Sequence, residues 1–218
     1  MRRALISLSG HVDSVDRVRS QLLRLEPMLT FDLVVGVDGG CKLLSRLNLS
    51  ADLILGDFDS VERVSPFESL WPKAKVLTFP AEKDMTDAEL AFDYVNETDI
   101  DEAIVIGGTG GRLDHALSVL FLAGHFRKAV LVDEQNIIWP FKAPFYREIN
   151  LDEVAGDYVS LIPMEKTLEG VTLRGFKYPL ASAVISPAQT LGVSNELVSK
   201  KGTIQVDRGE GLLIFSKD

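Results

Sequence analysis

The sequence of 218 residues has one cysteine, no long apolar run and fewer basic than acidic residues. Because Cys41 stands alone, the chain cannot form an internal disulfide, as is usual for proteins of a reducing compartment. No run of about 18 apolar residues occurs, so no transmembrane helix is predicted. Residues 1–10 are too polar for a secretory signal. We therefore expect a cytoplasmic protein without a membrane partner.

The charge balance argues against a nucleic-acid partner. The chain has 23 Lys and Arg against 32 Asp and Glu, which gives a formal net charge of −9. Proteins that bind nucleic acids need surplus basic residues for the phosphate backbone. An acidic protein can still bind a nucleotide when Mg²⁺ bridges its carboxylates to the phosphates.

The first 134 residues alternate between strand-like and helix-like patterns. Apolar strand-like runs occur at residues 4–8, 32–37, 53–55, 75–79, 102–106 and 129–132, and helical spacing occurs at 14–25, 41–47, 87–95 and 113–126. This alternation predicts a Rossmann-like parallel sheet with flanking helices over residues 1–134. Ligands of such sheets bind beyond the carboxyl ends of the strands.

The pattern changes near Glu134. Residues 135–218 contain short apolar runs separated by Pro and Gly, without helical periodicity. We therefore predict a second domain over residues 135–218, an all-β sandwich.

Two aspartates follow the predicted strand at residues 53–55. Asp57 and Asp59 are separated by one residue, so in an extended segment their carboxylates point to the same side and can share a cation. Mg²⁺ commonly takes one or two carboxylates together with phosphate oxygens and waters. The alternative is an ordinary Asp- and Ser-rich turn.

A second polar cluster opens the predicted helix at residues 87–95. Thr86 is a candidate N-cap with Glu89 three residues later, which is a capping-box pattern. Capping alone does not explain why Lys83, Asp84 and Asp87 gather at the same helix start. Lys83 could contact a phosphate there, and the two aspartates could extend a metal site.

A glycine-rich segment, 107–111, follows the strand at 102–106 and is followed at once by Arg112-Leu113-Asp114-His115. Glycines allow backbone N–H groups to approach a phosphate closely, and Arg112 adds a fork of donors. The spacing matches neither a Walker A sequence nor a dinucleotide fingerprint.

Asp38 lies at another strand end. In the second domain, Tyr178 beside Pro179 could offer an aromatic stacking surface.

Taken together, these segments resemble the thiamin pyrophosphokinase family. The resemblance rests on six motifs in order: Asp38-Gly39-Gly40, Gly56-Asp57-Phe58-Asp59-Ser60, Lys83-Asp84-Met85-Thr86-Asp87, Gly110-Gly111-Arg112-Leu113-Asp114-His115, Gly175-Phe176-Lys177-Tyr178-Pro179-Leu180 and Ser194-Asn195-Glu196.

The resemblance implies an enzyme that transfers pyrophosphate from ATP to the hydroxyl of thiamin, giving thiamin diphosphate and AMP. It implies a homodimer with active sites between the subunits, an N-terminal catalytic domain and a C-terminal domain for thiamin binding and dimerisation. The implied residues are Asp57, Asp59 and Asp87 for Mg²⁺, Asp38, Lys83, Asp84, Thr86, Gly110 and Gly111 for the nucleotide, Arg112 and Asp114 in the reaction cleft, and Tyr178, Ser194 and Asn195 for thiamin. Whether Asp114 or Asp59 accepts the hydroxyl proton stays open.

Other classes of function fit parts of the sequence. Residues 53–60 superficially resemble the Asp-x-Asp start of haloacid-dehalogenase-type phosphatases, in which the first aspartate becomes phosphorylated. That motif normally lies on the first strand, whereas two predicted strands precede it here. A non-catalytic binding module would lack the carboxylates, which are all present. A dinucleotide-binding domain would need a glycine fingerprint after the first strand.

Overall fold

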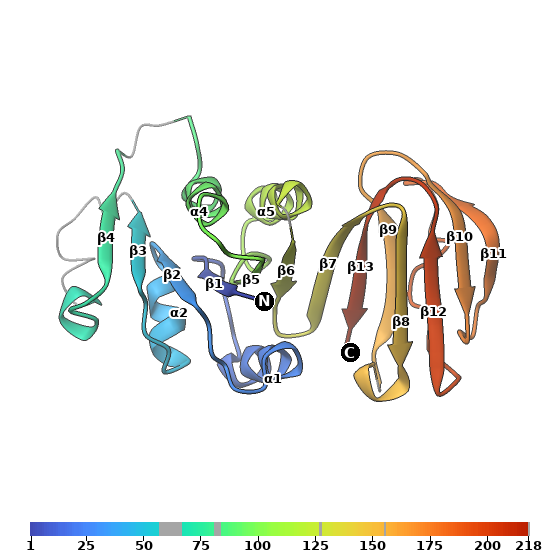
Figure 1. The fold of residues 1–218 in the computed structure, drawn as a ribbon, viewed down its shortest axis with the longest axis horizontal. Coiled ribbons are helices and arrows are strands. Elements are labelled where there is room, and N and C mark those ends of the chain that lie inside the picture. Colours follow the sequence, from blue (N-terminus) through green and yellow to red (C-terminus); the bar gives the residue numbers. More distant parts are fainter. Residues whose placement is uncertain (57–66, 81–83, 127, 155, 218) are drawn as a thin grey trace. The chain divides into compact units, whose positions relative to one another are not determined.

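The computed structural model describes residues 1–56, 67–80, 84–126, 128–154 and 156–217 (Figure 1). Asp57, Asp59 and Lys83 therefore lie outside the described residues. The chain divides into two compact units, Met1–Glu134 and Gln135–Asp218.

The first unit is built on a parallel sheet in the order β4-β3-β2-β1-β5-β6. Its strands are β1 (Arg3–Ser7), β2 (Leu33–Val37), β3 (Leu53–Gly56), β4 (Lys75–Thr78), β5 (Glu102–Ile106) and β6 (Ala129–Val132). The central strands read as continuous apolar runs because helices cover both of their faces. Leu5, Ile6 and Ile106, for example, are fully buried. The predicted Rossmann-like sheet is confirmed.

Helices cover both faces of this sheet (Figure 1). The helices α1 (Val15–Leu25) and α2 (Gly40–Arg46) lie on one face, and α4 (Asp87–Asn96) and α5 (Leu113–His125) lie on the other. The predicted cap at Thr86 is confirmed, since its Oγ1 accepts from the backbone N–H of Glu89 at 3.2 Å. None of the described helices is long and apolar enough to cross a membrane.

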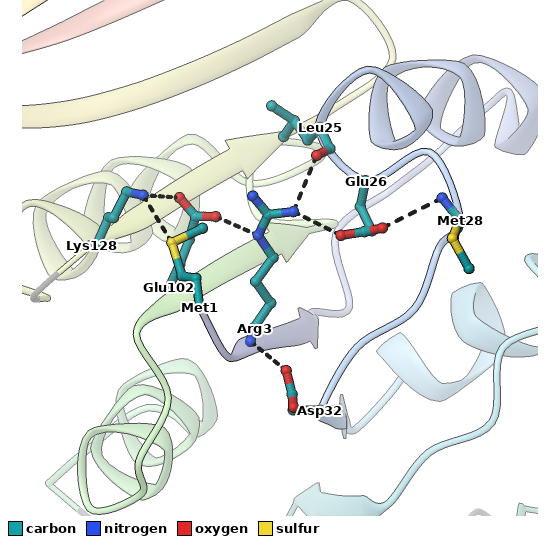
Figure 2. A network of polar contacts seen from close by, with 8 residues as sticks. All are labelled: Met1, Arg3, Leu25, Glu26, Met28, Asp32, Glu102 and Lys128. Carbon is teal, nitrogen blue, oxygen red and sulfur yellow. Dashed lines mark hydrogen bonds and ion pairs between the residues drawn. The ribbon is translucent and has the colours of Figure 1, made fainter.

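A polar network ties the amino ends of the strands together (Figure 2). Arg3, the first residue of β1, donates from Nε to Glu102 at 2.8 Å and from a terminal nitrogen to Glu26 at 2.7 Å. Lys128 pairs with the other oxygen of Glu102 at 2.8 Å. This network lies at the edge of the sheet opposite to the loops that follow β1, β2 and β5. It links α1, β1, β5 and the start of β6 without using a residue of those loops.

The second unit consists of two antiparallel sheets, β7-β13-β9 and β11-β10-β12-β8. Its strands are β7 (Asn136–Lys142), β8 (Phe145–Asn150), β9 (Tyr158–Pro163), β10 (Leu168–Arg174), β11 (Leu180–Ile185), β12 (Lys201–Val206) and β13 (Glu210–Ser216). One core joins both sheets, with Leu161 and Phe215 from the first and Val171 and Ile204 from the second. The predicted β-sandwich is confirmed.

Candidate active site

A cavity of about 370 Å³ opens in the first unit at the carboxyl ends of β1, β2 and β5. Its walls are the loops after these three strands and the first turns of α4 and α5. It is lined by Leu8, Ser9, Gly10, His11, Val37, Asp38, Thr86, Asp87, Ala88, Gly107, Gly108, Gly110, Gly111, Arg112, His115, Ser118 and Val119. The structure brings six of the predicted site residues together here: Asp38, Thr86, Asp87, Gly110, Gly111 and Arg112.

The loop after β1 is joined to the glycine-rich loop after β5 by backbone hydrogen bonds. Gly10 N–H donates to the Gly107 carbonyl at 2.9 Å, and His11 N–H donates to the Gly110 carbonyl at 3.1 Å. A Cβ at Gly10 would lie 2.2 Å from the Gly107 oxygen, and one at Gly110 would lie 1.9 Å from the His11 oxygen. These two glycines are therefore required for the close approach of the loops. Sequence reasoning missed this contribution of Gly10 and His11, because the partner loop is about a hundred residues away.

A second contact fixes the glycine-rich loop to the end of β6. Thr109 donates from Oγ1 to Asp133 at 2.8 Å. The next residue after Asp133, Glu134, accepts a hydrogen bond from the backbone N–H of Ser14, the N-cap of α1, at 2.5 Å. The loops after β1, β5 and β6 are thus mutually braced, so the cavity wall is largely formed before any ligand binds.

Asp38 reaches the cavity from a strained backbone. Its φ of 46° lies in the left-handed region, which aspartate tolerates better than most residues. The backbone N–H of Asp38 donates to the Leu55 carbonyl at 2.7 Å, which links the end of β2 to β3. Beneath it, burial together with the negative charge of Asp38 raises the pKa of the Cys41 thiol to about 12. Cys41 is therefore an inert core residue and not a nucleophile.

The first turn of α4 contributes Thr86 and Asp87 to the cavity. Acidic side chains are favoured at this position because the helix dipole is positive at its N-terminus. The same partial charge attracts the phosphates of a ligand. Asp84, in contrast, is exposed and does not line the cavity.

Arg112 precedes α5, lines the cavity and forms an ion pair with Asp114. Arg112 donates to both carboxylate oxygens of Asp114, at 3.1 Å from Nε and 2.6 Å from the terminal nitrogen. These hydrogen bonds lower the pKa of Asp114 to about 2. Asp114 is therefore ionised at neutral pH and is a weak base. His115 and Ser118 line the cavity one turn further along the helix, and neither was assigned there from the sequence.

A smaller cavity of about 190 Å³ lies in the second unit. It is lined by Tyr178, Leu180, Thr190, Leu191, Gly192, Val193 and Asn195. Tyr178 is 59% exposed, whereas Asn195 is 3% exposed. Ser194 lies outside this lining; it is exposed and its backbone N–H donates to the hydroxyl of Ser160 at 3.0 Å.

The carboxylates around the larger cavity are chemically suited to a hard divalent cation. Asp38 and Asp87 both line it, and Mg²⁺ takes such oxygen ligands. The register of β2 and β3 pairs Val37 with Leu55, so β3 ends beside Asp38. In the sequence, Asp57 comes directly after β3. Within the described residues no group of three His, Cys, Asp or Glu is placed to hold a metal. The described residues thus contribute two carboxylates to the cavity, of the type that Mg²⁺ takes.

The fold and the two cavities define the class: an α/β domain with a glycine-rich loop at its larger cavity, followed in the chain by a β-sandwich with an exposed tyrosine at its smaller one. Residues 28–132 match the catalytic domain of thiamin pyrophosphokinase, and residues 147–210 match its vitamin B1 binding domain. Thiamine pyrophosphokinase of Bacillus subtilis is 36% identical over 192 residues, which cover 85% of this chain and 88% of that relative. The chain belongs to the thiamin pyrophosphokinase family.

Solved structures agree with this assignment. A crystal structure of thiamine pyrophosphokinase from Bacillus subtilis aligns over the whole of both chains, with a TM-score of 0.84 and 32% identity. One from Geobacillus thermodenitrificans aligns over all of this chain and 98% of that chain, with a TM-score of 0.80 and 33% identity. The predicted enzyme class is confirmed: the chain is a kinase of the type that transfers pyrophosphate from ATP to thiamin.

Proposed function

We propose that the chain binds ATP in the 370 Å³ cavity and thiamin against Tyr178 of the second unit, and that it works with Mg²⁺. The observation that supports the nucleotide site best is the convergence of Gly110, Arg112 and Asp87 on one cavity at the carboxyl edge of the sheet. Backbone N–H groups, a guanidinium and a carboxylate are the groups that a metal-bound polyphosphate requires.

In the proposed reaction the thiamin hydroxyl oxygen bonds to the β-phosphorus of ATP. The bond from that phosphorus to the oxygen bridging to the α-phosphate breaks, and AMP leaves with that oxygen. The terminal pyrophosphoryl group stays on thiamin, giving thiamin diphosphate. Transfers of this kind depend chiefly on positioning the reactants and stabilising charge.

Asp57, Asp59 and Asp87 are the proposed metal ligands. Mg²⁺ held there would neutralise charge on the phosphate oxygens. Around it, backbone N–H groups of Gly110 and Gly111 would donate to the phosphates. Arg112 would exchange one of its bonds with Asp114 for a phosphate oxygen, because a phosphate and a carboxylate satisfy the same donors.

The braced loops explain how the protein positions these groups. Because Gly10 and His11 are hydrogen-bonded to the glycine-rich loop, that loop is already ordered before the nucleotide binds, and binding does not have to pay for its ordering. Lys83 and Asp84 are proposed to approach the polyphosphate from the segment before α4, and Thr86 to hold the start of that helix through its cap.

The proton of the thiamin hydroxyl needs an acceptor. Before a phosphate binds, Arg112 occupies both oxygens of Asp114 and lowers its pKa to about 2, and the proposed exchange of one of these bonds would free one oxygen. Asp59 is the other candidate and is also a proposed metal ligand, so the base stays open between Asp114 and Asp59.

Thiamin is proposed to stack its aromatic rings on Tyr178, whose exposed ring borders the smaller cavity. Ser194 lies in the chain between Val193 and Asn195, which line this cavity, and is proposed to complete the thiamin surface. We further propose a cytoplasmic homodimer in which each active site is formed between two subunits.

The test is to incubate the protein with thiamin, ATP and Mg²⁺ and to quantify all products. Equimolar AMP and thiamin diphosphate are expected, and a chelator should abolish both. Asp87→Asn should lower kcat, whereas Asp93→Asn, at an exposed position of the same helix, should not. Release of ADP or inorganic phosphate without AMP would contradict the proposal, as would full activity in the chelator.

A further inference from the structure

The second unit contains an asparagine whose side chain is bonded to the backbone of the proposed stacking residue. Asn195 Oδ1 accepts from the Tyr178 N–H at 3.0 Å, and Asn195 Nδ2 donates to the Tyr178 carbonyl at 2.8 Å. One side chain thereby satisfies both backbone groups of a residue 17 positions away, as a neighbouring strand would do.

Asn195 is itself fixed to the sandwich. Its backbone N–H donates to the Val159 carbonyl at 3.0 Å and its carbonyl accepts from the Val159 N–H at 2.7 Å, so it pairs with β9. Its Oδ1 also accepts from the Glu196 N–H at 2.9 Å. Two backbone donors facing one atom require that atom to be the amide oxygen, which sets the orientation of the amide.

These bonds leave the amide oxygen of Asn195 no capacity to bind a ligand. Its Oδ1 already accepts two hydrogen bonds, which is its full capacity, and the residue is 3% exposed. Any hydrogen bond from Oδ1 to a substrate would require giving up one to the backbone.

Tyr178 depends on its backbone for its position. The residue is 59% exposed, so packing alone holds its side chain weakly. Pro179 restricts the backbone of Tyr178 to extended conformations. The neighbouring Lys177 is paired with Glu196 through its backbone N–H at 2.9 Å and its side chain at 2.6 Å. The segment around Tyr178 is therefore held from the segment around Asn195.

We infer that Asn195 is a positioning residue, which sets the ring of Tyr178 for thiamin and does not itself contact the substrate. This inference rests on the proposed role of Tyr178. It replaces the direct contact with thiamin that the resemblance implied for Asn195. An independent contact and a positioning role differ in one measurable respect: a positioning residue loses its effect when the residue that it positions is removed.

The experiment is a double-mutant cycle on the full-length enzyme, with Tyr178→Ala, Asn195→Ala and the double variant. Each single variant should raise KM for thiamin roughly tenfold, as expected for loss of one aromatic stacking contact. KM for ATP and kcat at saturating thiamin should change less than about twofold. In the Tyr178→Ala background, Asn195→Ala should change KM for thiamin by less than about twofold. Asn150→Ala, an exposed asparagine of β8 whose amide donates to Glu153, is the matched control and should leave KM unchanged.

The outcomes separate the two levels of the proposal. If Tyr178→Ala leaves KM for thiamin unchanged, the proposed role of Tyr178 is wrong and this inference falls with it. If Tyr178→Ala raises KM but Asn195→Ala does not, or if the two effects multiply in the double variant, only the inference is overturned.

Asn195→Asp keeps the oxygen that faces two N–H groups but removes the donor to the Tyr178 carbonyl. It serves if Asn195→Ala does not fold, and it should show the same dependence on Tyr178. Fluorescence of Trp139, in β7 of the same unit, reports folding.

Discussion

Arg112 binds both carboxylate oxygens of Asp114, with distances of 3.1 and 2.6 Å, two residues along the chain at the start of α5. Both side chains are exposed, at 71% and 65%. The pairing joins Arg112, which lines the larger cavity, to a residue outside the lining. It therefore orients the guanidinium of Arg112 at the cavity.

The pair predicts a specific titration. In the folded protein the pKa of Asp114 is lowered to about 2 by the hydrogen bonds from Arg112. A lowered pKa stabilises the folded state above the unfolded value of about 3.9, and this contribution is lost as the pH falls towards 2. In Arg112→Ala the pKa of Asp114 should return towards about 3.9, as measured by NMR titration of the carboxyl carbon. A value that stays at about 2 would show that Arg112 is not the cause.

The proton acceptor can be distinguished by comparing two aspartates. If Asp59 is the base, Asp59→Asn should lower kcat by at least about 100-fold, in the range typical of general-base loss. Asp114→Asn should cost less, about tenfold, because its effect comes through the orientation of Arg112. Single-turnover kinetics at saturating ATP and thiamin measure both. A larger loss for Asp114→Asn would identify Asp114 as the base instead.

Substitution of a glycine where the two loops meet should cost more activity than substitution of a glycine with free space around it. In Gly110→Ala the added Cβ would lie 1.9 Å from the His11 oxygen, so the loops must separate. We expect loss of most activity together with a rise in KM for ATP. At Gly156 the φ is 77°, but an added Cβ meets no described atom within 4 Å.

Gly156→Ala therefore isolates the cost of backbone strain, about 1–2 kcal/mol of unfolding free energy, without loss of activity. If Gly110→Ala behaved like Gly156→Ala, the contact between the loops would have no role in nucleotide binding.

The sequence predicted the features that depend on local pattern. The Thr86 cap, the parallel strands and the position of Asp38 at a strand end follow from spacing along a few residues, and the structure reproduces each one.

The features that the sequence did not predict depend on distant partners. Gly10 and His11 acquire their role only when β1 and β5 become neighbours in the sheet. The resemblance implied a thiamin contact for Asn195, whereas its two bonds to Tyr178 exist only in the folded sandwich. The predicted ligands Asp57 and Asp59 lie outside the described residues, so their role stays a prediction.

The network at the amino ends of the strands should affect stability and not catalysis. Glu102 has a side chain 7% exposed and pairs with both Arg3 and Lys128. Glu102→Gln should lower the free energy of unfolding by about 1–3 kcal/mol, because a hydrogen-bonded charge is lost from a nearly buried site. Asp99→Asn is the control: this aspartate is 91% exposed and pairs with Arg2, so its loss should cost less than about 1 kcal/mol.

Urea unfolding followed by the fluorescence of Trp71, the tryptophan of the first unit, measures both changes. Specific activity per folded molecule should stay constant in both variants. A large loss of kcat in folded Glu102→Gln would mean that this network reaches the active site.

The most direct measurement is a crystal structure of the full chain with thiamin, Mg²⁺ and α,β-methylene ATP, in which the bond to be broken is blocked. We predict the triphosphate in the cavity between Gly110 and Arg112, one Mg²⁺ bound by Asp57, Asp59 and Asp87, and the thiamin hydroxyl in line with the β-phosphorus. A nucleotide bound elsewhere on the molecule, or these three aspartates without a shared ion, would contradict the proposed mechanism.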